Sequence, residues 1–85
     1  MRYTLVRDND GLIKESYDAG WIEWTDDDRF EEKHEDIAIG RSLILAPFTI
    51  GYTWLTTRVT KILEKSEKKI VFKTENSKYT LTWED

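Results

Sequence analysis

The side chains that most often perform chemistry in proteins are sparse in this 85-residue chain. There is no cysteine, and the one histidine, His34, lies among acidic neighbours, so a thiolate zinc site and a cysteine nucleophile are excluded. No serine lies at a spacing that pairs it with His34, and the glycines are isolated, so neither a catalytic triad nor a phosphate-binding loop is indicated. The sequence therefore predicts a non-enzymatic protein without a cofactor or a metal site.

Acidic side chains are concentrated in one segment. Between Lys14 and Asp36 ten acidic residues face three basic ones, a net charge of −7, whereas residues 37–85 carry a net charge of +3. Trp21 and Trp24 immediately precede the densest part of this acidic run, and because they lie three positions apart a regular strand cannot point both inward. Tryptophan beside a charged rim is typical of binding hot spots.

These residues predict a binding surface for a basic partner protein. Carboxylates can occupy sites that a basic, nucleic-acid-binding surface offers to phosphates, and they form charge-assisted hydrogen bonds with its arginines and lysines. The expected partner-binding residues are Trp21, Trp24, Asp26, Asp27, Asp28, Glu31, Glu32, Glu35 and Asp36. The plain alternative is a solvated segment that only keeps a small protein soluble.

A second hypothesis rests on the basic half of the chain. Aromatic rings between cations can stack a nucleotide base, so a nucleotide or cyclic dinucleotide could bind at Arg41, Tyr52, Trp54 and Arg58, and such a site could extend across a homo-oligomer interface. Direct binding of nucleic acid is disfavoured by the net charge of −4. A third alternative is a structural interaction module without a small ligand.

The stretch from Tyr52 to Trp83 contains the clearest strand pattern. If Asn76-Ser77 forms a two-residue turn, apolar residues on both flanking strands alternate with period two and fall on one face of a hairpin. The expected pairs are Thr74 with Tyr79, Phe72 with Leu81 and Ile70 with Trp83. Val59 and Ile62 lie at opposite parity, which predicts a β-bulge near Thr60-Lys61 that turns both inward. The charged residues 64–69 are expected to form a loop.

The remaining elements are shorter. Residues 2–7 and 12–17 predict two strands joined by a turn over Asp8–Gly11, and Leu43–Leu45 predicts a strand that ends at Pro47. Residues 26–36 predict either a long acidic loop or a short helix capped by Thr25, because their apolar periodicity is poor.

Together these elements predict one domain over residues 1–85. Five or six short strands with turn signals at regular spacing favour an all-β fold, a small SH3-like barrel with an acidic loop or short helix at 26–36. An α+β fold, an antiparallel sheet covered by one helix, is the alternative. No apolar run approaches the roughly 18 residues that span a bilayer, so we expect a soluble, cytoplasmic protein without a membrane partner.

The C-terminal half resembles short phage and bacterial proteins of unassigned function. The resemblance is carried by Leu43–Pro47, by Trp54-Leu55-Thr56-Thr57-Arg58-Val59, and by the run from Ile70 to Leu81, which ends in the pattern T-x-N-S-x-Y-x-L. It implies a small accessory protein, and a phage-encoded one would fit an inhibitor of a host nuclease or defence protein. The resemblance transfers no catalytic residue.

Overall fold

The computed structural model describes residues 2–45 and 54–84. Every regular element in these residues is a β-strand, which confirms the all-β fold class. The strands are β1 (Arg2–Arg7), β2 (Leu12–Ser16), β3 (Ala19–Trp24), β4 (Phe30–His34), β5 (Ser42–Leu45), β6 (Trp54–Leu55), β7 (Val59–Ser66), β8 (Lys69–Thr74) and β9 (Lys78–Glu84). No helix within these ranges is long and apolar enough to cross a membrane.

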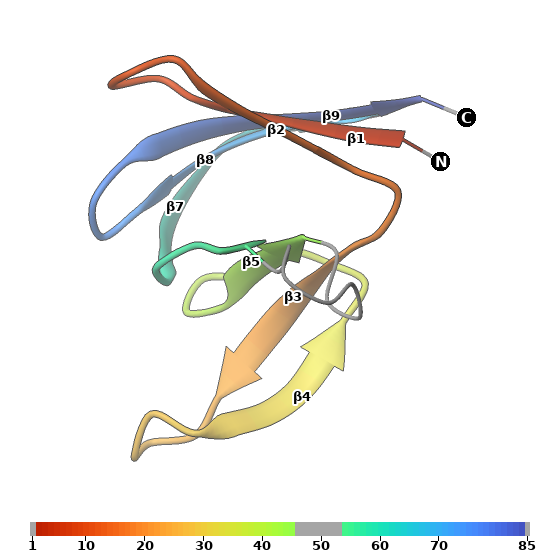
Figure 1. The fold of residues 1–85 in the computed structure, drawn as a ribbon. Helices are drawn as coiled ribbons and strands as arrows, with labels where there is room; N and C mark the ends of the chain where they lie inside the picture. Colours follow the sequence, from red (N-terminus) through yellow and green to blue (C-terminus); the bar gives the residue numbers. More distant parts are fainter. Residues whose placement is uncertain (1, 46–53, 85) are drawn as a thin grey trace.

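Two antiparallel sheets make up the molecule. One has five strands in the order β2-β1-β9-β8-β7, and the other has four in the order β4-β3-β5-β6. Figure 1 shows the two sheets as separate layers, with the β3–β4 hairpin extending away from the five-stranded sheet. The two sheets do not join into a closed barrel among the described strands, so the expected SH3-like barrel of five or six strands is not found.

The chain changes sheets at a bend between β6 and β7. Before the bend the Thr56 amide donates to the Leu43 carbonyl at 2.9 Å, and after it Val59 lies opposite Thr74 of β8. Bends of this kind form the corners of orthogonally packed sheets. The chain therefore passes from the four-stranded sheet to the five-stranded sheet at this bend.

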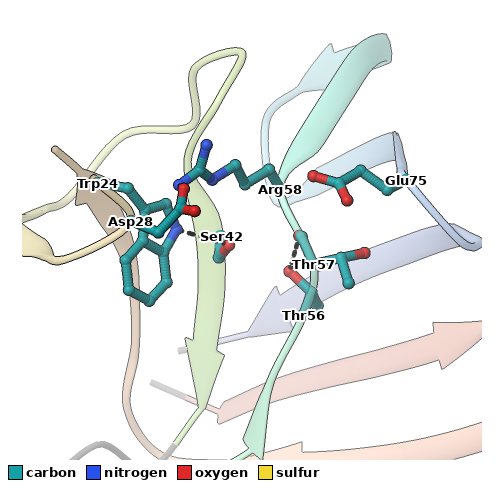
Figure 2. A pocket seen from close by; sticks show the side chains of 7 residues that line it. All are labelled: Trp24, Asp28, Ser42, Thr56, Thr57, Arg58 and Glu75. Atoms are coloured by element: carbon teal, nitrogen blue, oxygen red, sulfur yellow. Dashed lines mark hydrogen bonds and ion pairs between the residues drawn. The ribbon is translucent and has the colours of Figure 1, made fainter. Parts of the chain in front are cut away.

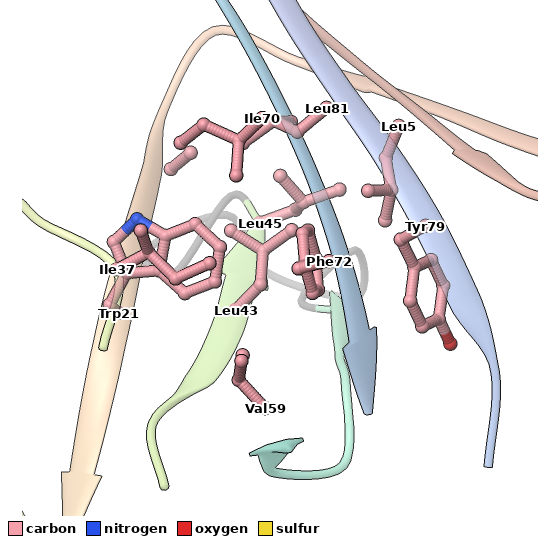
Figure 3. Packing of buried hydrophobic residues seen from close by; sticks show 11 residues of the cluster. Leu5, Trp21, Ile37, Leu43, Leu45, Val59, Ile70, Phe72, Tyr79 and Leu81 are labelled. Atoms are coloured by element: carbon pink, nitrogen blue, oxygen red, sulfur yellow. The ribbon is translucent and has the colours of Figure 1, made fainter. Parts of the chain in front are cut away.

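The core lies between the two sheets and is built by apolar side chains from both. The Phe72 ring of β8 stacks on Tyr79 of β9 at 5.4 Å between ring centroids, and the Trp21 indole of β3 meets Phe72 edge-on at 5.3 Å (Figure 3). Such aromatic pairs contribute about 0.5–1.5 kcal/mol each beyond their buried area. Trp21 is 3% exposed, so it joins the four-stranded sheet to the five-stranded one.

The β8–β9 hairpin has the predicted faces but not the predicted partners. Phe72 lies opposite Tyr79 and Ile70 opposite Leu81, a shift of two residues from the expected pairs. The expected two-residue turn is wrong because the Thr74 side chain organises a longer one: its hydroxyl accepts hydrogen bonds from the Asn76 and Ser77 amides at 3.4 and 3.3 Å. A shift by two preserves parity, so the inward face is unchanged.

The bulge in β7 is confirmed. The register with β8 shifts between Val59 and Lys61, which leaves Thr60 as the extra residue. Val59 is 1% exposed, and Ile62 packs against the core on the same side. The loop expected at residues 64–69 is wrong, because β7 continues to Ser66 and β8 begins at Lys69. Lys68 provides the tight turn between them with a φ of 68°.

Residues 26–36 form neither a helix nor a long loop. Most of them belong to a turn and to β4, which pairs with β3 in antiparallel register. The strand lacks apolar alternation because β4 is the edge of its sheet and extends beyond the cover of the other sheet (Figure 1). Polar side chains are therefore tolerated on both of its faces.

Candidate partner-binding surface

The acidic segment is held in one defined shape by the turn between β3 and β4. The Thr25 amide donates to the Arg29 carbonyl at 2.8 Å, and the Thr25 hydroxyl accepts from the Arg29 amide at 3.1 Å. Asp28 adopts a φ of 64°, a conformation that aspartate tolerates better than most residues. The turn therefore fixes where the three aspartates at 26–28 lie, even though all three are exposed.

A β-bulge in the same hairpin concentrates carboxylates. Glu23 pairs with Glu32 and Trp24 pairs with Phe30, so Glu31 is the extra residue on β4. A hydrogen bond between the Glu31 and Glu23 carboxyl groups raises the pKa of Glu31 and lowers the pKa of Glu23. This hydrogen bond is the largest cause of both shifts, because two adjacent carboxylates are stabilised when they share a proton; the hydrogen bond with His34 also lowers the pKa of Glu23.

Two side chains of the molecule contact Glu23 within this cluster. The His34 ring lies 2.8 Å from Glu23 through Nε2, and the Arg41 guanidinium lies 3.4 Å from the same carboxylate oxygen. Arg41 also donates to the Asp36 carbonyl at 2.8 Å. The hairpin thus has one carboxylate, Glu23, that is contacted by side chains of the molecule itself. Its outer carboxylates remain available to a partner protein.

The outer carboxylates are those that a partner can reach. Within the described residues, Asp26, Glu35 and Asp36 form no ion pair, and Glu32 lies only near His34, at 3.7 Å. Asp28 is paired with Arg58, while Asp27 lies 3.4 Å from Arg29 with both side chains largely exposed. Most of the negative charge therefore faces solvent rather than the protein's own cations.

The two tryptophans have different environments. Trp21 lies in the core against Phe72 and cannot contact a partner. Trp24 is half-buried at the end of β3, where its indole N–H donates to the Ser42 hydroxyl at 2.9 Å. The expectation that only one of the pair points inward agrees with this arrangement. Phe30, opposite Trp24, is 60% exposed and adds an apolar contact outside the expected set of partner-binding residues.

A shallow groove of about 350 Å³ lies beside the turn end of the β3–β4 hairpin (Figure 2). The Arg58 guanidinium lies over the Trp24 ring, 5.9 Å from its centroid, and pairs with Asp28. The lining residues are Trp24, Asp28, Ser42, Thr56, Thr57, Arg58 and Glu75. The groove therefore joins Trp24 and Asp28 of the expected partner surface to Arg58 of the alternative ligand set.

The four residues of the alternative ligand site are not brought together as one cluster. Arg41 lies in the carboxylate cluster, Arg58 lies in the groove, and Trp54 packs edge-on against Tyr79 at 5.8 Å between centroids. Tyr52 lies outside the described residues. The two carboxylates of the groove against one guanidinium also oppose the binding of a phosphate group there.

Several groove residues carried no sequence signal. Ser42, Thr56 and Glu75 come from β5, the sheet-changing bend and the β8–β9 turn, and nothing in their local sequence connects them. Phe30 is recognisable in the sequence as a large apolar residue within a charged run.

Comparison with protein-family models, with curated proteins and with solved structures finds no match for this chain. Among the described residues, no group of three or more histidine, aspartate or glutamate side chains is arranged to hold a metal ion.

Proposed function

We propose that this is a non-enzymatic binding protein whose β3–β4 hairpin engages the basic surface of another protein. The observation that carries the proposal is the hairpin itself, an edge element with eight acidic and two basic residues between Glu23 and Asp36. Most of its carboxylates face solvent, and a hydrogen-bonded turn and a bulge fix their positions. A pre-ordered charged surface loses less conformational entropy on binding than a disordered tail does.

The charge pattern favours a partner that normally binds nucleic acid. Carboxylates on a strand can occupy phosphate positions on such a surface and pair with its arginines. Phe30, exposed beside them, would supply apolar contact at the centre of the interface. Together with the resemblance to short phage and bacterial accessory proteins, this arrangement favours an inhibitor of a cytoplasmic host nuclease or defence protein.

The test is affinity capture from a host lysate with two matched charge variants. The hairpin variant, D26K/E32K/E35K, reverses three exposed carboxylates that do not hold the turn. The control variant, D18K/E67K/E84K, makes the same change in net charge at exposed positions outside the β3–β4 hairpin. We expect the wild type and the control to retain the same basic proteins, identified by mass spectrometry, and the hairpin variant to lose them.

Capture should also weaken as salt is raised, because exposed charges are screened over about 8 Å at physiological ionic strength. Equal capture by the wild type and the hairpin variant would refute the proposal. Loss in both variants would equally refute it, because the interaction would then depend on net charge rather than on the hairpin.

A further inference from the structure

Three lysines form a row across the outer face of the five-stranded sheet. Lys61 of β7 lies opposite Lys73 of β8, and Lys73 lies opposite Lys78 of β9. All three are exposed, and their neighbours Phe72 and Tyr79 point the other way, into the core. Adjacent strands lie about 4.7–4.9 Å apart, so the row places three positive charges within about 10 Å.

This row is unfavourable in the isolated molecule. Like charges directly opposite each other on neighbouring strands repel and destabilise a sheet. Among the described residues, Lys61 and Lys73 form no ion pair, and Lys78 has only Asp8 at 3.5 Å, with both side chains nearly half exposed. The repulsion within such a row of lysines is relieved when an acidic surface binds to it.

The surroundings of the lysine row disfavour nucleic acid as the occupant. Val71 and Thr80, the next residues along this face, provide no ring on which a base could stack, and the protein carries a net charge of −4. An acidic protein surface fits better. The chain itself provides one, the β3–β4 hairpin, on the other sheet (Figure 1).

We infer that the lysine row of one copy binds the β3–β4 hairpin of a second copy. This inference rests on the proposed function, because it uses the same preference of the hairpin for a basic surface. The contact is head-to-tail: each copy brings two different surfaces, so assembly continues to open chains unless the geometry closes it. A basic partner protein would compete with the lysine row for the hairpin, so self-association would cover the hairpin until that partner is present.

Charge-swapped variants test the contact directly. The hairpin variant D26K/E32K/E35K and the row variant K61E/K73E/K78E change only exposed side chains. Sedimentation is measured at about 0.01 M salt, where the Debye length is about 30 Å, and at about 1 M, where it is about 3 Å. We expect wild-type protein to sediment above its monomer mass of 10.1 kDa at low salt and as a monomer at high salt.

Each variant alone should be monomeric, with its self-dissociation constant raised at least about tenfold, because like charges now face each other. In an equimolar mixture the basic hairpin of the first variant can meet the acidic row of the second, and the unchanged lysine row of the first can meet the unchanged hairpin of the second. Association of the two variants should therefore return in the mixture. The control variant D18K/E67K/E84K should associate as the wild type does.

A wild type that stays monomeric at low salt overturns the inference, and so does a mixture in which association does not return. Either result leaves the proposed function to be judged by the capture experiment, where the row variant is expected to retain basic proteins that the hairpin variant loses. If the wild type captures no basic protein but the two charge-swapped variants still associate in the mixture, the hairpin binds only other copies of this protein.

Discussion

The same substitution at two valines should change the free energy of unfolding by different amounts on the two faces of the five-stranded sheet. Val59 of β7 is 1% exposed in the core, whereas Val71 of β8 is half-buried on the outer face. Val→Thr keeps the shape and adds a hydroxyl, so its cost measures whether that hydroxyl can find a hydrogen-bond partner. At Val71 solvent provides one, and we expect a change within about 0.5 kcal/mol.

At Val59 the hydroxyl of the residue on the facing strand is already hydrogen-bonded. Thr74 lies directly opposite, but its hydroxyl donates to the Ser77 carbonyl at 3.3 Å and accepts from the Asn76 and Ser77 amides. The hydroxyl of V59T would therefore be buried without a partner, at a cost of about 1–3 kcal/mol. For a domain of this size, a loss of ~2 kcal/mol lowers the Tm by about 8–16 °C.

Urea unfolding followed by tryptophan fluorescence, together with thermal unfolding followed by circular dichroism, measures both variants. The reasoning requires V59T to lose clearly more stability than V71T. Equal losses, or a larger loss at Val71, would show that the bulge at Thr60 does not turn Val59 into the core.

Two further predictions concern carboxyl groups. Arg7 donates two hydrogen bonds to Asp10, at 3.0 and 2.6 Å, and lowers the pKa of Asp10 to about 2. The stability that this pair contributes is therefore present above about pH 4 and is lost as the pH falls through about 2. In urea unfolding, D10N should be less stable than the wild type at neutral pH, and the gap should close near pH 2; a constant gap contradicts the assignment. The raised pKa of Glu31 means that its ionised form costs stability, so E31Q should be more stable than the wild type at neutral pH. That advantage should shrink below about pH 4, where both carboxyls of the pair bind protons in the unfolded chain; an advantage independent of pH would argue against the shared proton.

The faces of the strands could be predicted where one side of a strand is buried. Ile70, Phe72, Tyr79 and Leu81 alternate because the second sheet covers one side of β8 and β9, and the parity break at Val59 and Ile62 located the bulge. Exact partners could not be predicted, because a register slip of two residues leaves the same face inward. The longer turn that selects the observed register is closed by hydrogen bonds of the Thr74 amide and side chain.

The candidate surface was predicted by charge and not by shape. Clustering of the acidic residues along the sequence was enough to mark the segment, but β4 has no apolar alternation because the other sheet does not cover it. The turn at Asp28 uses a positive φ without glycine, which removed the usual hairpin signal. The groove could not be foreseen, since Ser42, Thr56 and Glu75 meet only through the tertiary fold.

The irregular course of β7 also affects how the protein behaves when crowded. β7 is an outer strand of its sheet, and its register with β8 is interrupted twice within eight residues. A straight outer strand invites further strands from other molecules to stack onto it, and interruptions of this kind twist its backbone out of line. We therefore expect the β7 edge to resist pairing with strands of other copies, so that a concentrated solution of the protein does not form ribbons along that side.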